Sequence, residues 1–440
     1  MSGNRIGCAS FFLGLFKYAA FLVKNAQNVS ATFEGSETFK TADADMRASS
    51  IDQNVHQMNG GYAFGRVKGN VYIERQERAI SKFQLPRRTN DFTGRDLELD
   101  EILVTLKQAI KDEAVAILSL VGMAGIGKSA LAICAAHQAK SYFPDLQLYM
   151  NLREEDGQPK DVGTVLKICL QMLGFGDGDI PSHVDELATR YRSRLSGKKA
   201  LVLIDNAQNR EQVEPLLPGS EGCAVIVTSR KSLVGLEGKK EVVLTPMTLL
   251  ESLALLEKLV GEKQVTESME AAREVVQLCG HLPLAIRITG ATLNRKRHWN
   301  LELDYLPLLR DEQRRLNYLS QDEKYGLRTS FELSYKNIED LDQHVFKILG
   351  VLPSDFGLEV AKEIGGLCSM EETEKCLDKL VDAQLLEAVE KQRYCYHDLM
   401  RLYARGLLLP DEISTAKRNY SQWYLDKADE FKESIESSHK

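Results

Sequence analysis

The sequence lacks an excess of basic residues. Its 440 residues include 56 Lys and Arg against 63 Asp and Glu, which gives a formal charge of −7 at pH 7. Proteins that bind nucleic acids generally carry a positive face that attracts phosphates, so this balance argues against a general nucleic-acid binder. One local basic face is still compatible with the net charge.

Paired cysteines and long apolar runs are also missing. The eight cysteines are scattered without a C-x-x-C pair, so we expect free thiols in a reducing cytoplasm rather than disulfides or zinc ligands. The most apolar N-terminal stretch, residues 11–23, is interrupted by Lys17, is too short to span a bilayer and precedes no A-x-A cleavage site. Segment 1–30 could be a packed or oligomer-forming helix, a helix that contacts a membrane through residues 9–23, or a secretion signal.

What the sequence does contain is a glycine-rich loop between a predicted strand and a predicted helix. Residues 116–131 (AILSLVGMAGIGKSAL) match the pattern G-x-x-x-x-G-K-[ST] in full. Backbone N–H groups of such a loop and the dipole of the following helix bind phosphates; Lys128 would reach the terminal phosphates and Ser129 would ligate Mg²⁺. The predicted cofactor-binding residues of the loop are Gly122, Met123, Ala124, Gly125, Ile126, Gly127, Lys128, Ser129 and Ala130.

Two further predicted strands place charged residues at the same edge of a sheet. The apolar strand at residues 200–204 ends at Asp205, and the strand at residues 223–227 is followed by Thr-Ser and Arg230. Ligands bind at the carboxyl ends of parallel strands, so we expect Asp205 to hold magnesium and Arg230 to report on a terminal phosphate. The candidate catalytic residues are Asp205, Lys128 and Arg230, and the candidate metal ligands are Ser129 and Asp205.

The rest of the chain changes from an α/β pattern to a helical one. Strands at residues 146–152 and 242–244 complete a parallel five-stranded α/β domain. Apolar positions at three- to four-residue spacing then predict helices at residues 251–260, 269–279 and 284–293, with Pro283 in a first helical turn. Residues 358–403 alternate helix, helix, two-stranded wing and helix, which suggests a winged-helix domain with His397 where the wing meets the last helix.

A small-residue pattern stands apart near the N-terminus. Residues 61–73 alternate small residues with larger ones, which is the period of a strand. The run N-x-G-x-A-x-G-x-V-x-G-x-V at residues 59–71 resembles amyloid signalling motifs of bacterial and fungal nucleotide-switch proteins, in which identical strands stack. The resemblance implies that residues 59–73 template an effector protein in the same way. A simple hairpin or an extra edge strand are the alternatives.

Six ordered motifs together resemble the NB-ARC module of the STAND ATPases, the nucleotide switches of plant disease-resistance receptors and their bacterial relatives. The motifs are FTGRD, GMAGIGKSALA, LVLIDNAQN, VIVTSR, CGHLPLAIRI and YHDLMRLYA, and their wording is most similar to the bacterial branch. The resemblance implies that Gly94 and Arg95 contact the adenosine end of ATP or ADP, that Pro283 packs on adenine, and that His397 contacts the β-phosphate of ADP.

The resemblance also implies a domain plan. Its parts are an apolar helical segment (1–30), a polar linker with the glycine-spaced motif (31–84), a nucleotide-binding P-loop NTPase domain (85–248), an ARC1-like helical domain (249–320), an ARC2-like winged-helix domain (321–408) and the start of a TPR-like helical region (409–440).

Asn206 departs from the family pattern, in which a second acid often follows the first. An amide can orient water but cannot accept its proton, so we expect slow hydrolysis at most. The expected function is an ATP/ADP-dependent switch that self-associates on activation, in bacterial defence or regulated cell death. A plain ATPase and an NTPase-coupled transcription regulator are the alternatives.

Overall fold

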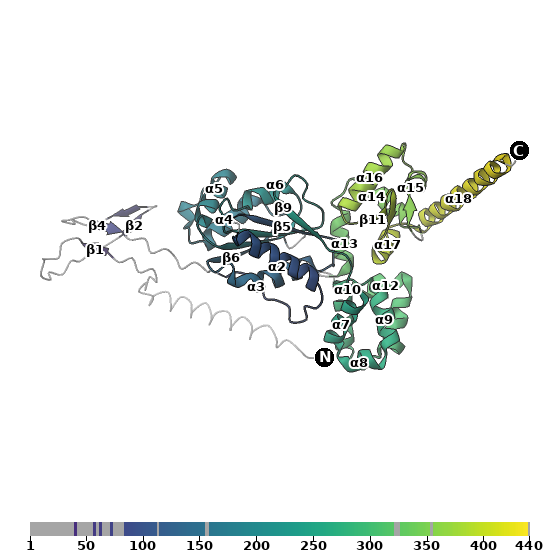
Figure 1. Cartoon of the computed structure of the whole chain (residues 1–440), viewed down its shortest axis with the longest axis horizontal. Coiled ribbons are helices and arrows are strands. Elements are labelled where there is room, and N and C mark those ends of the chain that lie inside the picture. The colour runs from purple at the N-terminus through teal and green to yellow at the C-terminus, as the bar shows by residue number, and fades with distance from the viewer. Residues whose placement is uncertain are drawn as a thin grey trace, which may run out of the picture. The chain divides into compact units, whose positions relative to one another are not determined.

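The computed structural model describes residues 39–41, 56–58, 61–63, 71–73, 83–111, 114–154, 158–320, 326–352 and 355–438. The chain divides into two compact units, Met1–Ile80 with Gly174–Gly178, and Ser81–Leu173 with Asp179–Lys440. Figure 1 shows their elements. The helical segment predicted at residues 1–30 lies outside the described residues.

The described part of the first unit contains two short antiparallel sheets. Strand β1 (Phe39–Thr41) pairs with β4 (Val71–Ile73), and β2 (His56–Met58) pairs with β3 (Gly61–Ala63). Two parts of the glycine-spaced motif therefore pair with different strands, while residues 59–60 and 64–70 lie outside the described part of the chain. Stacking of this motif between copies stays a prediction.

The second unit is built on a five-stranded parallel sheet, as predicted. Its order is β6-β7-β8-β5-β9. The strands are β5 (Ala116–Val121), β6 (Leu146–Asn151), β7 (Ala200–Ala207), β8 (Ala224–Ser229) and β9 (Lys239–Val243). Strands β5 and β8 are neighbours, but the chain continues from β5 to β6 on one side of this pair and from β8 to β9 on the other side. Ligands of parallel sheets bind at the carboxyl ends of two such strands.

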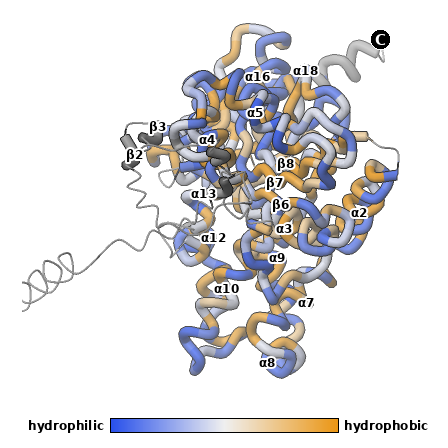
Figure 2. The backbone as a smooth tube through the Cα atoms, turned by 90° about the vertical axis from the view of Figure 1, so that its left-hand side faces the viewer, coloured by the Kyte–Doolittle hydropathy of each residue, from blue (hydrophilic) through white to orange (hydrophobic). Residues whose placement is uncertain are grey.

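The core of this sheet is apolar on both faces because helices cover both. Strands β7 and β8 are almost fully buried, and Figure 2 shows this part of the sheet in orange, at the hydrophobic end of the scale. The surrounding helices are α2 (Asp96–Lys111), α3 (Lys128–Gln138), α4 (Val162–Met172), α5 (Val184–Leu195) and α6 (Arg210–Val213). Short 3-10 helices lie at Ala139–Ser141, Asp177–Asp179 and Glu214–Leu216.

After β9 the chain is helical. The elements are α7 (Leu249–Val260), α8 (Glu262–Glu267), α9 (Met269–Leu278), α10 (Pro283–Arg295), the π-helix η4 (Leu301–Tyr305), α11 (Leu306–Arg310) and α12 (Glu312–Tyr318). Helix α7 begins with a capping box in which the Thr248 hydroxyl and the Glu251 carboxylate each accept a hydrogen bond from the other residue's N–H. Helices α8, α11 and α12 escaped prediction because stretches of five to seven residues show little periodicity.

The C-terminal part combines helices with a small antiparallel sheet. Its elements are α13 (Leu327–Tyr335), α14 (Asp340–Leu349), β10 (Phe356–Gly357), α15 (Leu358–Gly365), α16 (Met370–Asp382), β11 (Glu387–Glu390), β12 (Arg393–Cys395), α17 (Asp398–Arg405) and α18 (Pro410–Ser438). The predicted wing strands occur as β11 and β12, and β10 adds a third strand to the sheet. None of the helices in the described residues has an apolar stretch long enough to cross a membrane.

We expect Gly290→Ala to destabilise the packing of α10 on α7. A Cβ at Gly290 would lie 2.6 Å from the Leu259 Cβ, and overpacking of this kind costs about 1–3 kcal/mol. The midpoint of thermal unfolding, followed by circular dichroism, should therefore fall. The control is Gly365→Ala in α15, where the nearest atom would be 3.5 Å away, so its midpoint should stay or rise slightly. Equal midpoints for the two variants would contradict the prediction.

Candidate functional site

The glycine-rich loop joins the carboxyl end of β5 to the start of α3, as predicted. Gly122 and Gly127 have φ angles of 154° and 99°, a region that residues with a Cβ rarely adopt. A Cβ on Gly122 would also lie 2.9 Å from the backbone oxygen of Leu244. The path of the loop past β9 therefore requires glycine.

The N-terminus of α3 has the properties of an anion site. Its N-cap residue is Gly127, which has no side chain to accept a hydrogen bond from the first helical N–H groups. These groups have no partners within a helix, and the helix dipole is positive at this end, so a phosphate fits here. The Lys128 ammonium donates to the carbonyl oxygens of Gly122 (2.7 Å) and Met123 (2.9 Å), on the loop itself.

A buried carboxylate lies beside the loop. Asp205 on β7 is 5% exposed and accepts hydrogen bonds from the hydroxyls of Ser129 (2.6 Å), Tyr149 (3.0 Å) and Thr228. The two predicted magnesium ligands are thus in direct contact, and hydroxyl and carboxylate oxygens suit Mg²⁺. Within the described residues no group of three or more His, Cys, Asp or Glu side chains could hold a metal, so a magnesium ion here would also need phosphate oxygens or water.

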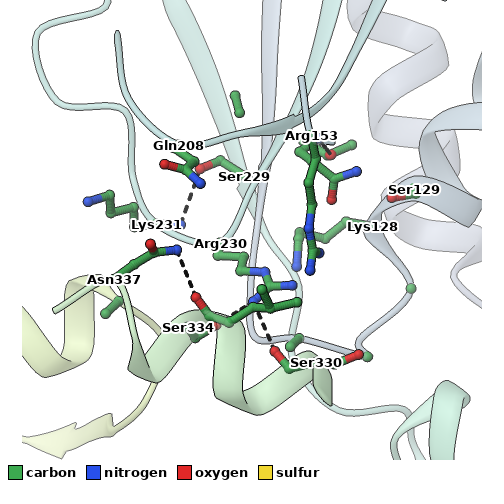
Figure 3. A pocket seen from close by; sticks show the side chains of 18 of the residues that line it. Lys128, Ser129, Arg153, Gln208, Ser229, Arg230, Lys231, Ser330, Ser334 and Asn337 are labelled. Carbon is green, nitrogen blue, oxygen red and sulfur yellow. Dashed lines mark hydrogen bonds between the residues drawn. The ribbon is translucent and has the colours of Figure 1, made fainter. Parts of the chain in front are cut away.

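A cavity of about 450 Å³ beside this loop (Figure 3) is lined by five cationic residues, Lys128, Arg153, Arg230, Lys231 and Arg287. Arg287 forms an ion pair with Asp91, and Lys231 is exposed, which leaves Lys128, Arg153 and Arg230 as the cations of the cavity wall. Burial, followed by the charge of Arg230, lowers the pKa of Lys128 to about 7, although Asp205 opposes the change. Burial and then the charge of Arg153 lower the pKa of Arg230 to about 10. The mutual repulsion of these groups makes the cavity favourable for an anion.

Residues far along the chain complete the cavity. Arg230 donates from Nη1 to the backbone oxygen of Ser330 (2.9 Å) and to the Ser334 hydroxyl (3.0 Å), both on α13 (Figure 3). The backbone N–H of Leu284, at the start of α10, donates to the oxygen of Gly125 in the loop (3.2 Å). The glycine-rich loop is therefore held by α10, and Arg230 by α13.

Many of the predicted site residues line this cavity. They are Ala124, Gly125, Gly127, Lys128, Ser129, Ala130, Arg230 and Pro283. Asp205 lies below them through its bond to Ser129. Gly122, Met123 and Ile126 are buried where the loop packs on the sheet, outside the lining of this cavity.

Three predicted nucleotide contacts, Gly94, Arg95 and His397, are also absent from the lining of the cavity within the described residues. Arg95, 5% exposed, donates from Nη2 to the oxygens of Ile126 and Thr245, and so ties the segment before α2 to the loop. Its backbone N–H donates to Oε1 of Glu251, against which Gly94 also packs.

His397 lies between the helical part and the C-terminal part. Its Nε2 is 2.8 Å from the backbone oxygen of Gly280, and its Nδ1 accepts from the N–H of Leu399 (3.3 Å) at the start of α17. Burial lowers the pKa of this histidine. The predicted contacts of Gly94, Arg95 and His397 with a nucleotide stay predictions.

Sequence reasoning missed Arg153 and the serines of α13. Arg153 follows the carboxyl end of β6, so the rule that located Asp205 could have found it. Ser330 and Ser334 lie 100 and 104 residues after Arg230, and no local pattern connects residues at that separation.

Comparison with known proteins places this site in a family. The family described as NB-ARC domain matches residues 95–266. The regulatory protein AfsR of Streptomyces coelicolor is 41% identical over 328 residues, covering 73% of this chain and 33% of AfsR. This chain contains an NB-ARC domain. The resemblance inferred from the six motifs is thereby confirmed, and the family implies nucleotide binding.

More distant relatives include plant proteins. The disease resistance protein RPP13 of Arabidopsis thaliana is 28% identical over 321 residues, covering 65% of this chain and 37% of RPP13. A STAND protein with a tetratricopeptide repeat sensor from Pyrococcus horikoshii is similar in structure at a TM-score of 0.36 and 19% identity, over 79% of this chain and 47% of that one. This NB-ARC domain protein spans about a third of the length of the curated relatives that it matches.

We expect nucleotide affinity to fall as the pH rises from about 7 to about 9. The pKa of Lys128 is about 7 in the folded protein, against an ordinary value of 10.5. Between pH 7 and pH 10.5 the unfolded chain therefore binds more protons at Lys128 than the folded protein does, so the contribution of Lys128 to the free energy of unfolding should rise with pH. A bound polyphosphate favours the ammonium form, so binding above pH 7 must take up a proton and should weaken by up to about tenfold per pH unit. Titration calorimetry with Mg·ADP in buffers of different ionisation enthalpy measures both the affinity and the proton uptake on binding.

The control for this experiment is Lys128→Arg, because a guanidinium stays charged across the whole interval. The affinity of this variant for Mg·ADP should be weaker than that of the wild type at pH 7 and should hardly change between pH 7 and pH 9. A wild-type affinity that is constant over this interval without proton uptake would contradict either the lowered pKa of Lys128 or its contact with the phosphates.

Proposed function

We propose that this NB-ARC domain protein is a switch in which an adenine nucleotide with Mg²⁺ sets whether the C-terminal helices stay docked on the sheet. The observation that carries the proposal is the contact of Arg230 with α13. Arg230 follows the carboxyl end of β8, close enough to Lys128 for its charge to act on that group, and it also holds Ser330 and Ser334. One cation therefore serves both the expected phosphate site and the docked helix.

Competition for Arg230 supplies the coupling. A hydrogen bond between two charged groups is roughly twice as strong as one to a neutral oxygen, so a terminal phosphate would attract the guanidinium away from Ser334. ADP lacks that phosphate and leaves Arg230 on α13. The nucleotide then shifts the equilibrium between docked and released forms by the difference in its affinity for the two.

Slow hydrolysis would make such a switch a timer. Asn206 lines the cavity and donates from Nδ2 to Oδ1 of Asn151 (3.0 Å) and to Oδ2 of Asp205 (3.3 Å). Its amide is therefore used to orient the neighbouring side chains and offers no proton acceptor of useful basicity. This supports a bound triphosphate that persists rather than rapid turnover.

We propose the following domain assignments for the helices after the sheet, and nucleotide contacts for three further residues. Helices α7–α12 form the helical domain, α13–α17 with β10–β12 the winged-helix domain, and α18 the start of a repeat region. His397, seated on Gly280 in the docked form, connects the first two and would contact ADP from the winged-helix side. Gly94 and Arg95 would lie at the adenosine end.

A signalling role in the cytoplasm follows from this proposal. Relatives are named a regulatory protein and a disease resistance protein, which supports regulation rather than metabolism. Release of the winged-helix domain would expose surfaces for self-association and bring the N-terminal segments together, in bacterial defence or regulated cell death. The net charge of −7 makes nucleic acid a less suitable partner.

Ser334→Ala should loosen the docked form. It removes one of the two hydrogen bonds from Arg230, worth about 0.5–1.5 kcal/mol, so ADP should dissociate about twofold to tenfold faster in stopped-flow measurements. The matched control is Ser330→Ala, which keeps the backbone oxygen that Arg230 uses. Identical dissociation rates in both variants would show that the Arg230–Ser334 contact does not hold the nucleotide.

The switch itself is tested by particle mass. We expect light scattering to give monomers with ADP and larger assemblies with Mg²⁺ and adenosine 5′-(β,γ-imido)triphosphate. His397→Ala should assemble even with ADP, because the docked form loses its contact with Gly280. Monomers under all of these conditions would contradict a switch that works by self-association.

A further inference from the structure

Arg153 is a half-buried cation in the wall of the cavity. It follows β6, and its backbone is fixed by a hydrogen bond from its N–H to Oδ1 of Asn151 (3.1 Å) and by a bridge to Pro159. The Lys128 ammonium and the Arg230 guanidinium both donate to protein oxygens. Within the described residues, by contrast, the Arg153 guanidinium makes no hydrogen bond or ion pair.

The position of Arg153 mirrors that of Arg230. Strands β6 and β8 lie on either side of β7, and each is followed by one of the two arginines. Both side chains point into the cavity from its walls, as Figure 3 shows. The end of β7 between them carries Asp205, the expected magnesium ligand. A phosphate chain that runs from α3 over the end of β7 would thus meet one arginine on each side.

The charges around Arg153 favour an anion at this place. Partial burial next to two other cations is unfavourable for a guanidinium. Asp205 attracts Arg153 but already accepts three hydroxyl hydrogen bonds, so it does not neutralise the arginine pair. An arginine with a fixed backbone and free donors is suited to binding a phosphate through two parallel bonds.

We propose that Arg153 binds the terminal phosphate of a nucleoside triphosphate opposite Arg230, and so makes the cavity prefer the triphosphate to the diphosphate. This inference rests on the proposed nucleotide switch. In the docked form Arg230 is occupied by α13, whereas Arg153 is free to bind. Arg153 therefore engages the incoming triphosphate first, and Arg230 joins it when it leaves Ser334.

The test compares two ligands on the full chain. Affinities of wild type, Arg153→Ala and Arg153→Lys for Mg·ADP and for the magnesium complex of adenosine 5′-(β,γ-imido)triphosphate are measured by titration calorimetry. We expect Arg153→Ala to weaken the triphosphate analogue about tenfold or more, as for the loss of a charge-assisted hydrogen bond, and to change ADP affinity less than about twofold. The affinity of Arg153→Lys for the analogue should fall between those of the wild type and Arg153→Ala, because lysine keeps the charge but lacks the paired N–H donors of the guanidinium.

Two controls separate the possible failures. Arg88→Ala removes an exposed arginine outside the cavity and should leave both affinities unchanged. Lys128→Ala should lower the affinity for both ligands. The inference about Arg153 is overturned if Arg153→Ala lowers the affinities for ADP and for the analogue equally, or lowers neither, while Lys128→Ala behaves as expected. In that case the proposed switch still stands. If the wild type binds neither nucleotide, the proposed function fails with it.

Discussion

The site depends on one buried charge, the carboxylate of Asp205. A charge removed from water is unfavourable by several kcal/mol unless hydrogen bonds compensate it. Here the compensation comes from the Asn206 amide and from three hydroxyls on three different elements: Tyr149 on β6, Ser129 on α3 and Thr228 on β8. The bond from Ser129 holds the start of α3, and with it the glycine-rich loop, against the carboxyl edge of the sheet.

The cations around this carboxylate give the cavity its chemical character. Lys128, Arg153 and Arg230 carry more positive charge than Asp205 can balance, and their neighbouring charges depress the pKa values of Lys128 and Arg230 beyond the effect of burial. Such an arrangement favours the binding of an anion. The three cations differ in their partners: Lys128 bonds to the loop, Arg230 bonds to α13, and the Arg153 guanidinium makes no hydrogen bond in the part of the chain that the structure describes.

Docking of the helical parts combines single hydrogen bonds with ion pairs, among them Arg287 with Asp91 and Arg405 with Glu312. Leu284 donates to Gly125, Arg230 to Ser334, and His397 lies on Gly280. A typical hydrogen bond contributes about 0.5–1.5 kcal/mol net, so no single hydrogen bond locks the assembly. A ligand that changes the preference of even one cation can therefore shift the balance between docked and released forms, which is the property that a nucleotide switch needs.

The sequence by itself determined the local architecture of the sheet domain. Strand, loop and helix around residues 116–131 follow from glycine spacing and apolar runs, and the motif order identified the NB-ARC family, because these signals lie within short segments or in their sequence order. Only the tertiary structure decided that Arg230 reaches Ser334 on α13, that Arg153 shares its cavity, and that His397 rests on Gly280 rather than in the cavity lining. Those contacts depend on how separate helices pack against the sheet, and packing between residues 100 or more positions apart leaves no trace in local spacing.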